Sequence, residues 1–394
     1  MRKTILTFTL AALMLAGCAS QENGGNTRQA DTENIGTTPV SKIWEGYEEL
    51  QGKQYGGVFT MPDVITPNSA EEYYTFLWDF DPYPEADEPF AREFYKSFFG
   101  ESYKDEYVTV KDFNVLYNAP DGAFGAVAST VIVNASRDGS FPADGELLGE
   151  YDPVKDGAVS MELEEGSCTV SEAVAAASEL MDKTFAAYYP EYEYVPVRVK
   201  YIASKMAHPY DPPGELVATA QVHFMVSYKG LFLEDASLLF ETENKGYYMV
   251  STSIIPSCID LDINKKGSVS VINSMGKLPA PVSEQVDELM SLDQAVELME
   301  SELAPQSGYK FSRVELRYCC KYSMPQLIPT EETMGKDIIL DFPEETAKMF
   351  EEFGEVVRRF DPTWCFYFGV EGSGTSVRVN ARTGEITIDQ EVIY

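Results

Sequence analysis

Two stretches of this chain, one starting at Thr169 and one at Ser291, repeat the same order of sequence patterns. Each begins with a hydroxyl residue and has Glu172 or Gln294 three positions later, the spacing of a capping box at a helix start. Apolar residues then recur at helical intervals, and a segment of alternating apolar and charged residues follows. One-sided helices and strands bury their apolar faces against each other, so we predict an α+β fold.

The strands that follow the two predicted helices correspond between the copies. Alternating segments occupy 197–201 and 314–318, and aromatic-rich segments occupy 222–226 and 364–368. In the second copy, the sequence NARTGE at 380–385 predicts a turn between the last two strands.

The helix start SLDQAV, the antiparallel strands and the closing VNARTGEI turn of the second copy resemble PepSY-like modules. The resemblance implies a helix packed on an antiparallel sheet, and we expect two such modules, at 166–280 and 281–394. The first copy matches less closely because no comparable closing turn follows its last strands. The wider arrangement is similar to uncharacterised lipoproteins of clostridia and, more distantly, to envelope proteins that regulate sensor histidine kinases.

The second copy departs from a plain module by an insert at 325–362, where a short turn would be expected. Apolar residues recur at helical intervals from Pro343 to Phe360, with Glu344 in the first turn and Arg359 in the last. This order of charges suits the helix dipole. The pattern predicts a helix that faces the core, with a partner-binding helix as the alternative.

Residues 1–18 have the pattern of an export signal that ends in a lipobox. A charged start precedes an apolar run that is too short to span a bilayer, and LAGC at 15–18 completes the box. We therefore expect a signal peptide at 1–17 and lipid on the sulfur of Cys18. Residues 18–42 contain few large apolar side chains and are expected to form a flexible tether.

Residues 43–165 are expected to form an N-terminal α+β domain. Ser69 and Glu72 have capping-box spacing, and the aromatic residues after them predict a helix that extends to Phe80. Farther along, strand-like segments flank the turn sequence NAPDG at 118–122, which predicts a β-hairpin.

Charge excludes one class of partner. The formal net charge is −34, so the chain repels nucleic acid and anionic lipid headgroups, and no nucleic-acid partner is expected. The acidity is typical of an exported protein that must stay soluble, and attraction of cations or basic partners is the alternative.

The cysteines leave two alternatives open. Export permits disulfides, yet few cysteines in a chain of this size do not make a disulfide scaffold. Neighbouring side chains point to opposite faces of a strand, and Cys320 shares the apolar face, so Cys319 is the better partner for Cys365. A Cys319–Cys365 disulfide is one hypothesis, and buried reduced thiols are the other.

No pattern in the sequence indicates catalysis. The two histidines, His208 and His223, belong to neither an HExxH nor a G-x-S-x-G pattern, and His223 is expected to be structural or exposed. We assign no catalytic residue, no metal ligand and no cofactor.

The acidic segment 79–88 is interpreted as a solvated loop, with a Ca²⁺ site as the alternative. Tyrosines at 188–194 are interpreted as packing residues, with sugar stacking as the alternative.

These patterns lead to one leading hypothesis on function. We expect an extracytoplasmic lipoprotein, held by Cys18 on the cell membrane of a Gram-positive organism, that binds a protein or peptide of the envelope and is not an enzyme. The alternative is an envelope protein that binds carbohydrate or a small ligand, or a carbohydrate-active enzyme.

Replacing Cys18 with Ala is expected to abolish lipid attachment, because lipid is transferred to the cysteine sulfur. Processing sensitive to globomycin and retention in the membrane fraction should both be lost, as measured by lipid labelling and fractionation. A Cys168→Ala variant is the matched control and should label normally. Continued lipid labelling of the Cys18→Ala variant would contradict the lipobox hypothesis.

Overall fold

The computed structural model describes residues 36–78, 88–111, 114–128, 132–207, 216–234, 238–241, 247–250, 258–265, 267–275, 281–304, 307–320, 359–368 and 376–389. The predicted signal peptide, Cys18, most of the tether, His208 and most of the insert lie outside these residues. Within the ranges given, no helix is both long enough and apolar enough to cross a membrane.

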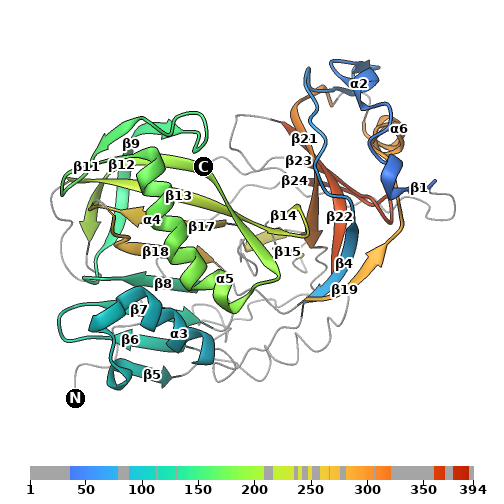
Figure 1. The fold of residues 1–394 in the computed structure, drawn as a ribbon. Helices are drawn as coiled ribbons and strands as arrows, with labels where there is room; N and C mark the ends of the chain where they lie inside the picture. Colours follow the sequence, from blue (N-terminus) through green and yellow to red (C-terminus); the bar gives the residue numbers. More distant parts are fainter. Residues whose placement is uncertain are drawn as a thin grey trace.

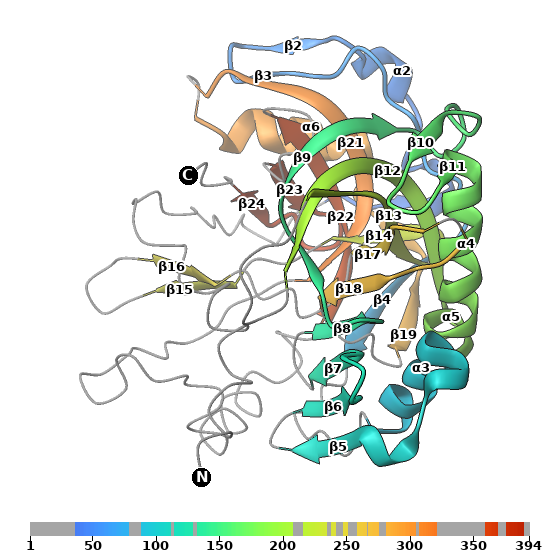
Figure 2. The ribbon, with the colours of Figure 1, turned by 90° about the vertical axis from the view of Figure 1, so that its left-hand side faces the viewer.

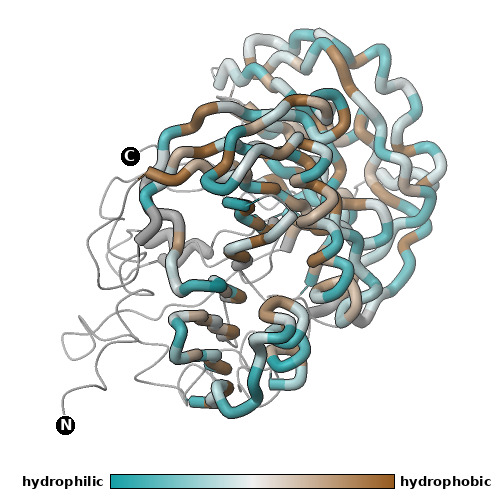
Figure 3. The backbone as a smooth tube through the Cα atoms, turned by 60° about the vertical axis from the view of Figure 1, so that its left-hand side comes forward, coloured by the Kyte–Doolittle hydropathy of each residue, from teal (hydrophilic) through white to brown (hydrophobic). Residues whose placement is uncertain are grey.

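One large antiparallel sheet, here the first sheet, fills one side of the molecule (Figure 1). Its strands, in spatial order, are β5 (Val108–Lys111), β6 (Asn114–Asn118), β7 (Phe124–Ala128), β8 (Ile132–Ser136), β18 (Val271–Met275), β17 (Cys258–Ile263), β13 (Leu216–Tyr228), β12 (Tyr192–Ala207) and β9 (Phe141–Tyr151). Hydrophobic and hydrophilic residues alternate along these strands (Figure 3), as a sheet covered on one face requires.

Helices cover one face of the first sheet. They are α3 (Glu88–Phe99), α4 (Val170–Lys183) and the short α5 (Phe185–Tyr188). The predicted capping box starts α4: the Glu172 backbone N–H donates to Thr169 Oγ1 at 3.2 Å, and the Thr169 N–H donates to Glu172 Oε2 at 2.8 Å. The buried stripe of α4 then packs on β12, β13 and β17, as the helical periodicity predicts.

A second set of strands, here the second sheet, is built around β21 (Tyr309–Cys320) and β22 (Arg359–Phe368). Its other members are β23 (Ser376–Asn380), β24 (Ile386–Asp389), β4 (Tyr73–Trp78), β19 (Pro281–Val286), β3 (Phe59–Thr60) and β2 (Gln54–Tyr55). The helices α2 (Tyr47–Leu50) and α6 (Leu292–Glu302) lie beside it (Figure 1). The predicted capping box of Ser291 and Gln294 starts α6.

Trp364 fixes the N-terminal segment against the second sheet. Its buried indole Nε1–H donates to the Met290 carbonyl at 2.9 Å, and its ring meets Trp44 edge-on at 4.8 Å between centroids. The short strands β1 (Thr38–Pro39) and β20 (Glu288–Leu289) pair nearby. Paired structure therefore begins before residue 43, inside the segment predicted to be a tether.

The strand β14 (Leu231–Glu234) links the two sheets. It follows β13 through the two-residue turn Lys229–Gly230, whose φ angles of 51° and 83° suit a type I′ hairpin. Its last two residues then pair in parallel with Tyr318 and Cys319 of β21. The two sheets are thus joined through backbone hydrogen bonds.

Strands from residues 43–165 contribute to both sheets. β8 pairs with β18, and β9 with β12, in the first sheet, whereas β4 pairs with β19 and β22 in the second. The mixed α+β class is as predicted. The division into an N-terminal domain and two modules stays a prediction, and backbone ladders cross both of its internal boundaries.

The predicted helix over residues 69–80 is wrong, because Tyr73–Trp78 form β4. Aromatic and threonine side chains favour a strand packed on both faces, and here the tertiary pairing decides between helix and strand. The helix of this region is α3 instead, whose buried residues recur at helical intervals: Phe90, Ala91, Phe94, Tyr95, Phe98 and Phe99.

The end of the predicted insert helix is also wrong. Arg359 and Phe360 begin β22 and pair with Leu77 and Phe76 of β4, so they are extended. The rest of that helix lies outside the described residues. The predicted hairpin at 118–122 is confirmed, since β6 and β7 pair across it.

Two further hairpins lie apart from the two sheets. They are β10 (Ser160–Glu162) with β11 (Ser167–Thr169), and β15 (Leu238–Glu241) with β16 (Tyr247–Val250).

Candidate functional site

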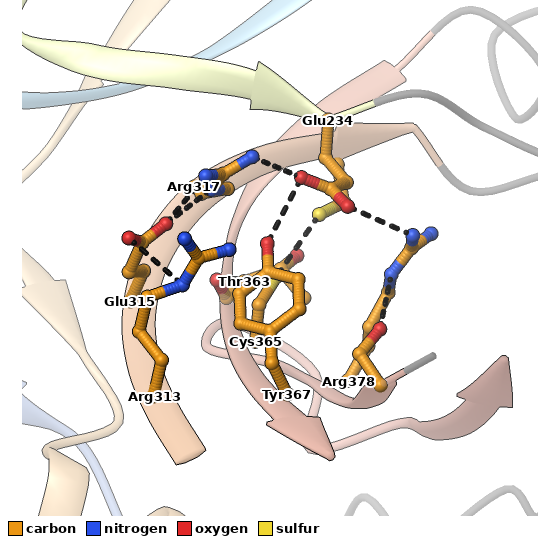
Figure 4. Close-up of polar contacts among 10 residues, drawn as sticks. Glu234, Arg313, Glu315, Arg317, Thr363, Cys365, Tyr367 and Arg378 are labelled. Atoms are coloured by element: carbon orange, nitrogen blue, oxygen red, sulfur yellow. Dashed lines mark hydrogen bonds and ion pairs between the residues drawn. The ribbon is translucent and has the colours of Figure 1, made fainter. Parts of the chain in front are cut away.

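A buried ionic cluster lies where β14 meets the second sheet (Figure 4). It consists of Glu234 at the end of β14, Arg317 on β21, Tyr367 on β22 and Arg378 on β23. The side chains of Glu234, Arg317 and Arg378 are about nine-tenths buried. We call this set the Glu234 cluster.

Both carboxylate oxygens of Glu234 are occupied. Oε2 accepts from Arg317 Nη1 and, at 3.0 Å, from the Tyr367 hydroxyl, while Oε1 accepts from Arg378 Nη2 at 3.3 Å. Burial alone would raise the pKa of Glu234, but Arg317 and Arg378 outweigh it and hold this pKa below its ordinary value. The carboxylate is therefore ionised and accepts three hydrogen bonds from buried or partly buried donors.

A second carboxylate balances the charge of Arg317. Glu315 Oε2 accepts from Arg317 Nε at 2.6 Å, and Glu315 Oε1 pairs with Arg313 Nε at 3.2 Å. The guanidinium carbon of Arg313 also lies 4.3 Å from the centroid of the Tyr367 ring. Opposite charges alternate along the cluster, which is the arrangement that makes buried charges tolerable.

The chemistry of the Glu234 cluster is structural. A general base needs a pKa near the working pH, whereas the pKa of Glu234 is held below its ordinary value. The cluster instead ties β14 to three strands of the second sheet through side chains. It therefore fixes the first sheet relative to the second.

Two thiols adjoin this cluster. Cys319 and Cys365 are free and buried, and their sulfur atoms lie 3.5 Å apart. The expectation from strand alternation that Cys319 and Cys365 share a face agrees with this contact. The proposed disulfide stays a prediction.

His223 belongs to a set of polar side chains on the first sheet. Its Nδ1 lies 2.7 Å from Asp260 Oδ1, across the paired strands β13 and β17. Two residues along β17, Asp262 is buried, and its Oδ1 accepts from Gln221 Nε2 at 3.3 Å. Its Oδ2 has no hydrogen-bond partner among the residues that the structure describes. Burial, and then the nearby Asp260, raise the pKa of Asp262 to about 7.

The open edge of the first sheet is a second candidate for function. β9 pairs with β12 on one side, and no strand of the described residues pairs with its other side (Figure 2). Leu147 and Leu148 on this strand are 54% and 46% exposed. The pairing of β9 with β12 shifts register here, since Gly149 pairs with Tyr201 and Leu147 with Ile202, so Leu148 is the extra residue of a bulge. Two exposed leucines therefore lie together at a bulge of the edge strand.

The tyrosines considered for sugar stacking are mostly packed. Tyr189 and Tyr192 are buried, and Tyr188 and Tyr189 both contact the ring of Phe90 on α3. Tyr188 is exposed in part. These rings form the contact between α3 and α5, which supports the packing interpretation.

The other predicted binding features are placed only in part. Of the acidic segment 79–88, only Glu88 is described; it begins α3 and pairs with Arg92 at 2.7 Å. Within the described part of the chain, no three His, Cys, Asp or Glu side chains are grouped to hold a metal ion.

Sequence reasoning missed both the Glu234 cluster and the β9 edge. No local pattern marks Glu234, because its partners Arg317 and Arg378 are distant in sequence and meet it only through the pairing of β14 with β21. The adjacent leucines in GELLGEY were a usable signal for β9, since a half-covered strand alternates instead of placing two leucines together.

Comparisons with known proteins return no relative. No protein-family model, curated protein or solved structure matches this chain.

Replacing Glu234 with Gln is expected to lower the free energy of unfolding by about 3 kcal/mol, because two buried arginines lose their shared anion. Urea unfolding at pH 7 measures this. The control Glu179→Gln changes an exposed carboxylate that pairs with Lys183 on α4, and it should leave the free energy of unfolding nearly unchanged. Equal losses in the two variants would contradict a special role for Glu234.

The pH dependence of the same variant checks the charge state of Glu234. Its pKa is depressed in the folded protein, so its contribution is present above the ordinary value of 4.5 and is lost as the pH falls through the folded value. The difference in stability between wild type and Glu234→Gln should therefore shrink below pH 4.5. A difference that stays constant down to pH 2 would contradict this assignment.

Replacing Asp262 with Asn should act in the opposite pH range. The raised folded pKa means that the stability contributed by protonated Asp262 is present below pH 3.8 and is lost as the pH rises to about 7. Above pH 7, the Asp262→Asn variant should thus be more stable than the wild type by roughly 3 kcal/mol, because it removes a buried carboxylate. Thermal unfolding at pH 4 and pH 8 gives the comparison, and an unchanged or lower relative stability at pH 8 would refute it.

Proposed function

We propose that this chain is a lipid-anchored extracytoplasmic lipoprotein that binds a protein or peptide of the cell envelope and does not act as an enzyme. The observation that carries the proposal is the unpaired, leucine-bearing edge of β9. Natural proteins protect sheet edges with bulges, prolines and charged side chains, and β9 has two register shifts, Pro142 and two glutamates; Leu147 and Leu148 nevertheless remain exposed on it. An edge left open in this way suits a partner that adds a strand.

The geometry of β9 favours strand addition over helix docking. Backbone donors and acceptors of an edge strand are directed outward in its plane, and they bind an extended segment along its length. Leu147 and Leu148, at the bulge of β9, would pack against apolar side chains of that segment.

The charge around this edge indicates the kind of segment. Glu146 and Glu150 are exposed next to the leucines, and the chain as a whole is strongly acidic. Apolar residues interspersed with Lys or Arg would complement this edge, and the net charge would increase the rate of encounter with a basic partner. We therefore expect an extended segment with both kinds of residue.

Anchoring and rigidity support the same function. Lipid on Cys18 would keep the protein beside proteins that project from the membrane, as in the lipoproteins that the sequence resembles. The Glu234 cluster holds the sheets together, so β9 is presented on a preorganised frame, which lowers the entropy cost of binding. The carbohydrate alternative has no comparable support, because most of its tyrosines are packed.

Charged substitutions on β9 should abolish partner capture. In cells that carry the full-length protein, the double variant Leu147→Lys, Leu148→Lys is expected to reduce crosslinked envelope partner at least tenfold, because lysines repel basic residues and remove the apolar contact. Pull-down after crosslinking and quantitative mass spectrometry measures the loss. Val64→Lys, at a position that is 71% exposed between β3 and β4, is the matched control and should retain the partner.

Three outcomes would contradict the proposal. The double variant could retain the partner, or it could lose it no more than Val64→Lys does. Wild-type protein could instead form a concentration-dependent dimer that the double variant lacks, which would make a second copy the occupant of the edge. Failure to crosslink any protein, together with a clear signal on a glycan array, would favour the carbohydrate alternative.

A further inference from the structure

The two thiols beside the Glu234 cluster are placed for reaction with each other. Cys319 on β21 and Cys365 on β22 are 6% and 0% exposed, and their sulfur atoms are in contact at 3.5 Å. They are not directly opposed in the ladder, because Cys319 pairs with Asp361 and Cys365 pairs with Glu315. The two residues are four positions apart along the ladder, on the same face of the paired strands.

The surroundings of Cys319 and Cys365 favour an uncharged reaction product, such as a disulfide. Cys365 Sγ also lies 3.7 Å from the Thr363 carbonyl, and the pair adjoins Tyr367, whose hydroxyl is engaged by Glu234. A disulfide carries no charge and needs no hydrogen bond, so burial beside the ion pairs does not penalise it. Cys168 is buried on the strand β11, which belongs to a separate hairpin.

We propose that Cys319 and Cys365 form a dithiol that is oxidised to a disulfide after export. The reaction is exchange with a disulfide-bearing thiol oxidant of the envelope. One cysteine thiolate attacks the oxidant disulfide and forms a mixed disulfide, and the second thiolate then displaces the oxidant sulfur. The protein loses two protons and two electrons, and the oxidant leaves as two thiols.

The exchange takes place while β21 and β22 are pairing. Burial, and next the neighbouring Cys319, raise the pKa of the Cys365 thiol, so the closed protein holds too little thiolate for attack. Partly folded chains expose both cysteines to the oxidant. Once formed, the bond closes a loop with a sequence separation of 46 and reduces the entropy of the unfolded chain.

The consequence for the molecule is local reinforcement. Arg317 and Tyr367 are two residues away from Cys319 and Cys365 along the same strands, and both bind Glu234. A bond between the two cysteines would hold β21 and β22 in the register that presents these donors. Oxidation would thus strengthen the junction between the two sheets. This inference is independent of partner binding at β9.

Peptide mapping of the full-length, detergent-extracted protein tests the proposal. The protein is unfolded with reductant and refolded in glutathione buffers of increasing oxidised fraction, and free thiols are trapped with N-ethylmaleimide in acid. A peptide containing Cys319 joined to Cys365 is expected in most wild-type molecules. The Cys168→Ser control should give the same peptide, whereas in Cys319→Ser the Cys365 thiol should be trapped at least tenfold more often.

The wild-type map decides the question even where a variant folds poorly. Trapping of both thiols in most molecules at every oxidised fraction would overturn the proposal, as would a bond from Cys365 to Cys320 or Cys258. A second measurement compares thermal unfolding before and after oxidation. A midpoint several degrees higher in oxidised wild type, absent in Cys319→Ser, supports the reinforcement, and an equal shift in both contradicts it.

Discussion

The relative placement of the two sheets depends on the short strand β14 and the carboxylate at its end. β14 is covalently continuous with the first sheet through a tight turn, yet its final residues pair with β21 of the second. Two pairs of residues in a parallel ladder would by themselves hold the two sheets together only weakly. Glu234 adds charged hydrogen bonds to Arg317 and Arg378, and their strength comes from the burial that would otherwise make each charge costly.

Aromatic packing works together with this ionic joint. Tyr228, the last residue of β13, meets Phe76 of β4 at 4.9 Å and Tyr318 of β21 at 6.0 Å between ring centroids. The apolar contact supplies most of the favourable burial, whereas the ion pairs accept only one alignment of the strands. The Glu234 cluster and the aromatic contact therefore contribute to the same junction in different ways, the first through directed hydrogen bonds and the second through burial of apolar surface.

The sequence allowed good predictions where local signals and tertiary packing agree. Thr169 and Ser291 start helices because the capping residue, its partner three positions later and the apolar stripe all indicate the same structure. Ser69 has the same spacing, but the aromatic residues after it pair with β19 and β22, and distant strands outweigh a local cap. Arg359 likewise fits a helix end in sequence and is held extended by β4. Glu234 could not be located this way, because its partners depend on which strands become neighbours, whereas the adjacent leucines of β9 were a local signal that went unused.

The distribution of early strands over both sheets has a consequence for biogenesis. Among the described strands, β4 pairs with β19 and with β22, which lies near the end of the chain. β8 and β9 also pair with strands that come later in the sequence. Contacts of such high contact order form slowly, and the first third of the chain has incomplete sheets until the last third arrives. A protein threaded across a membrane from its N-terminus would therefore complete its fold only after translocation ends. Its unpaired strands would need protection by the folding machinery on the far side of the membrane during that interval.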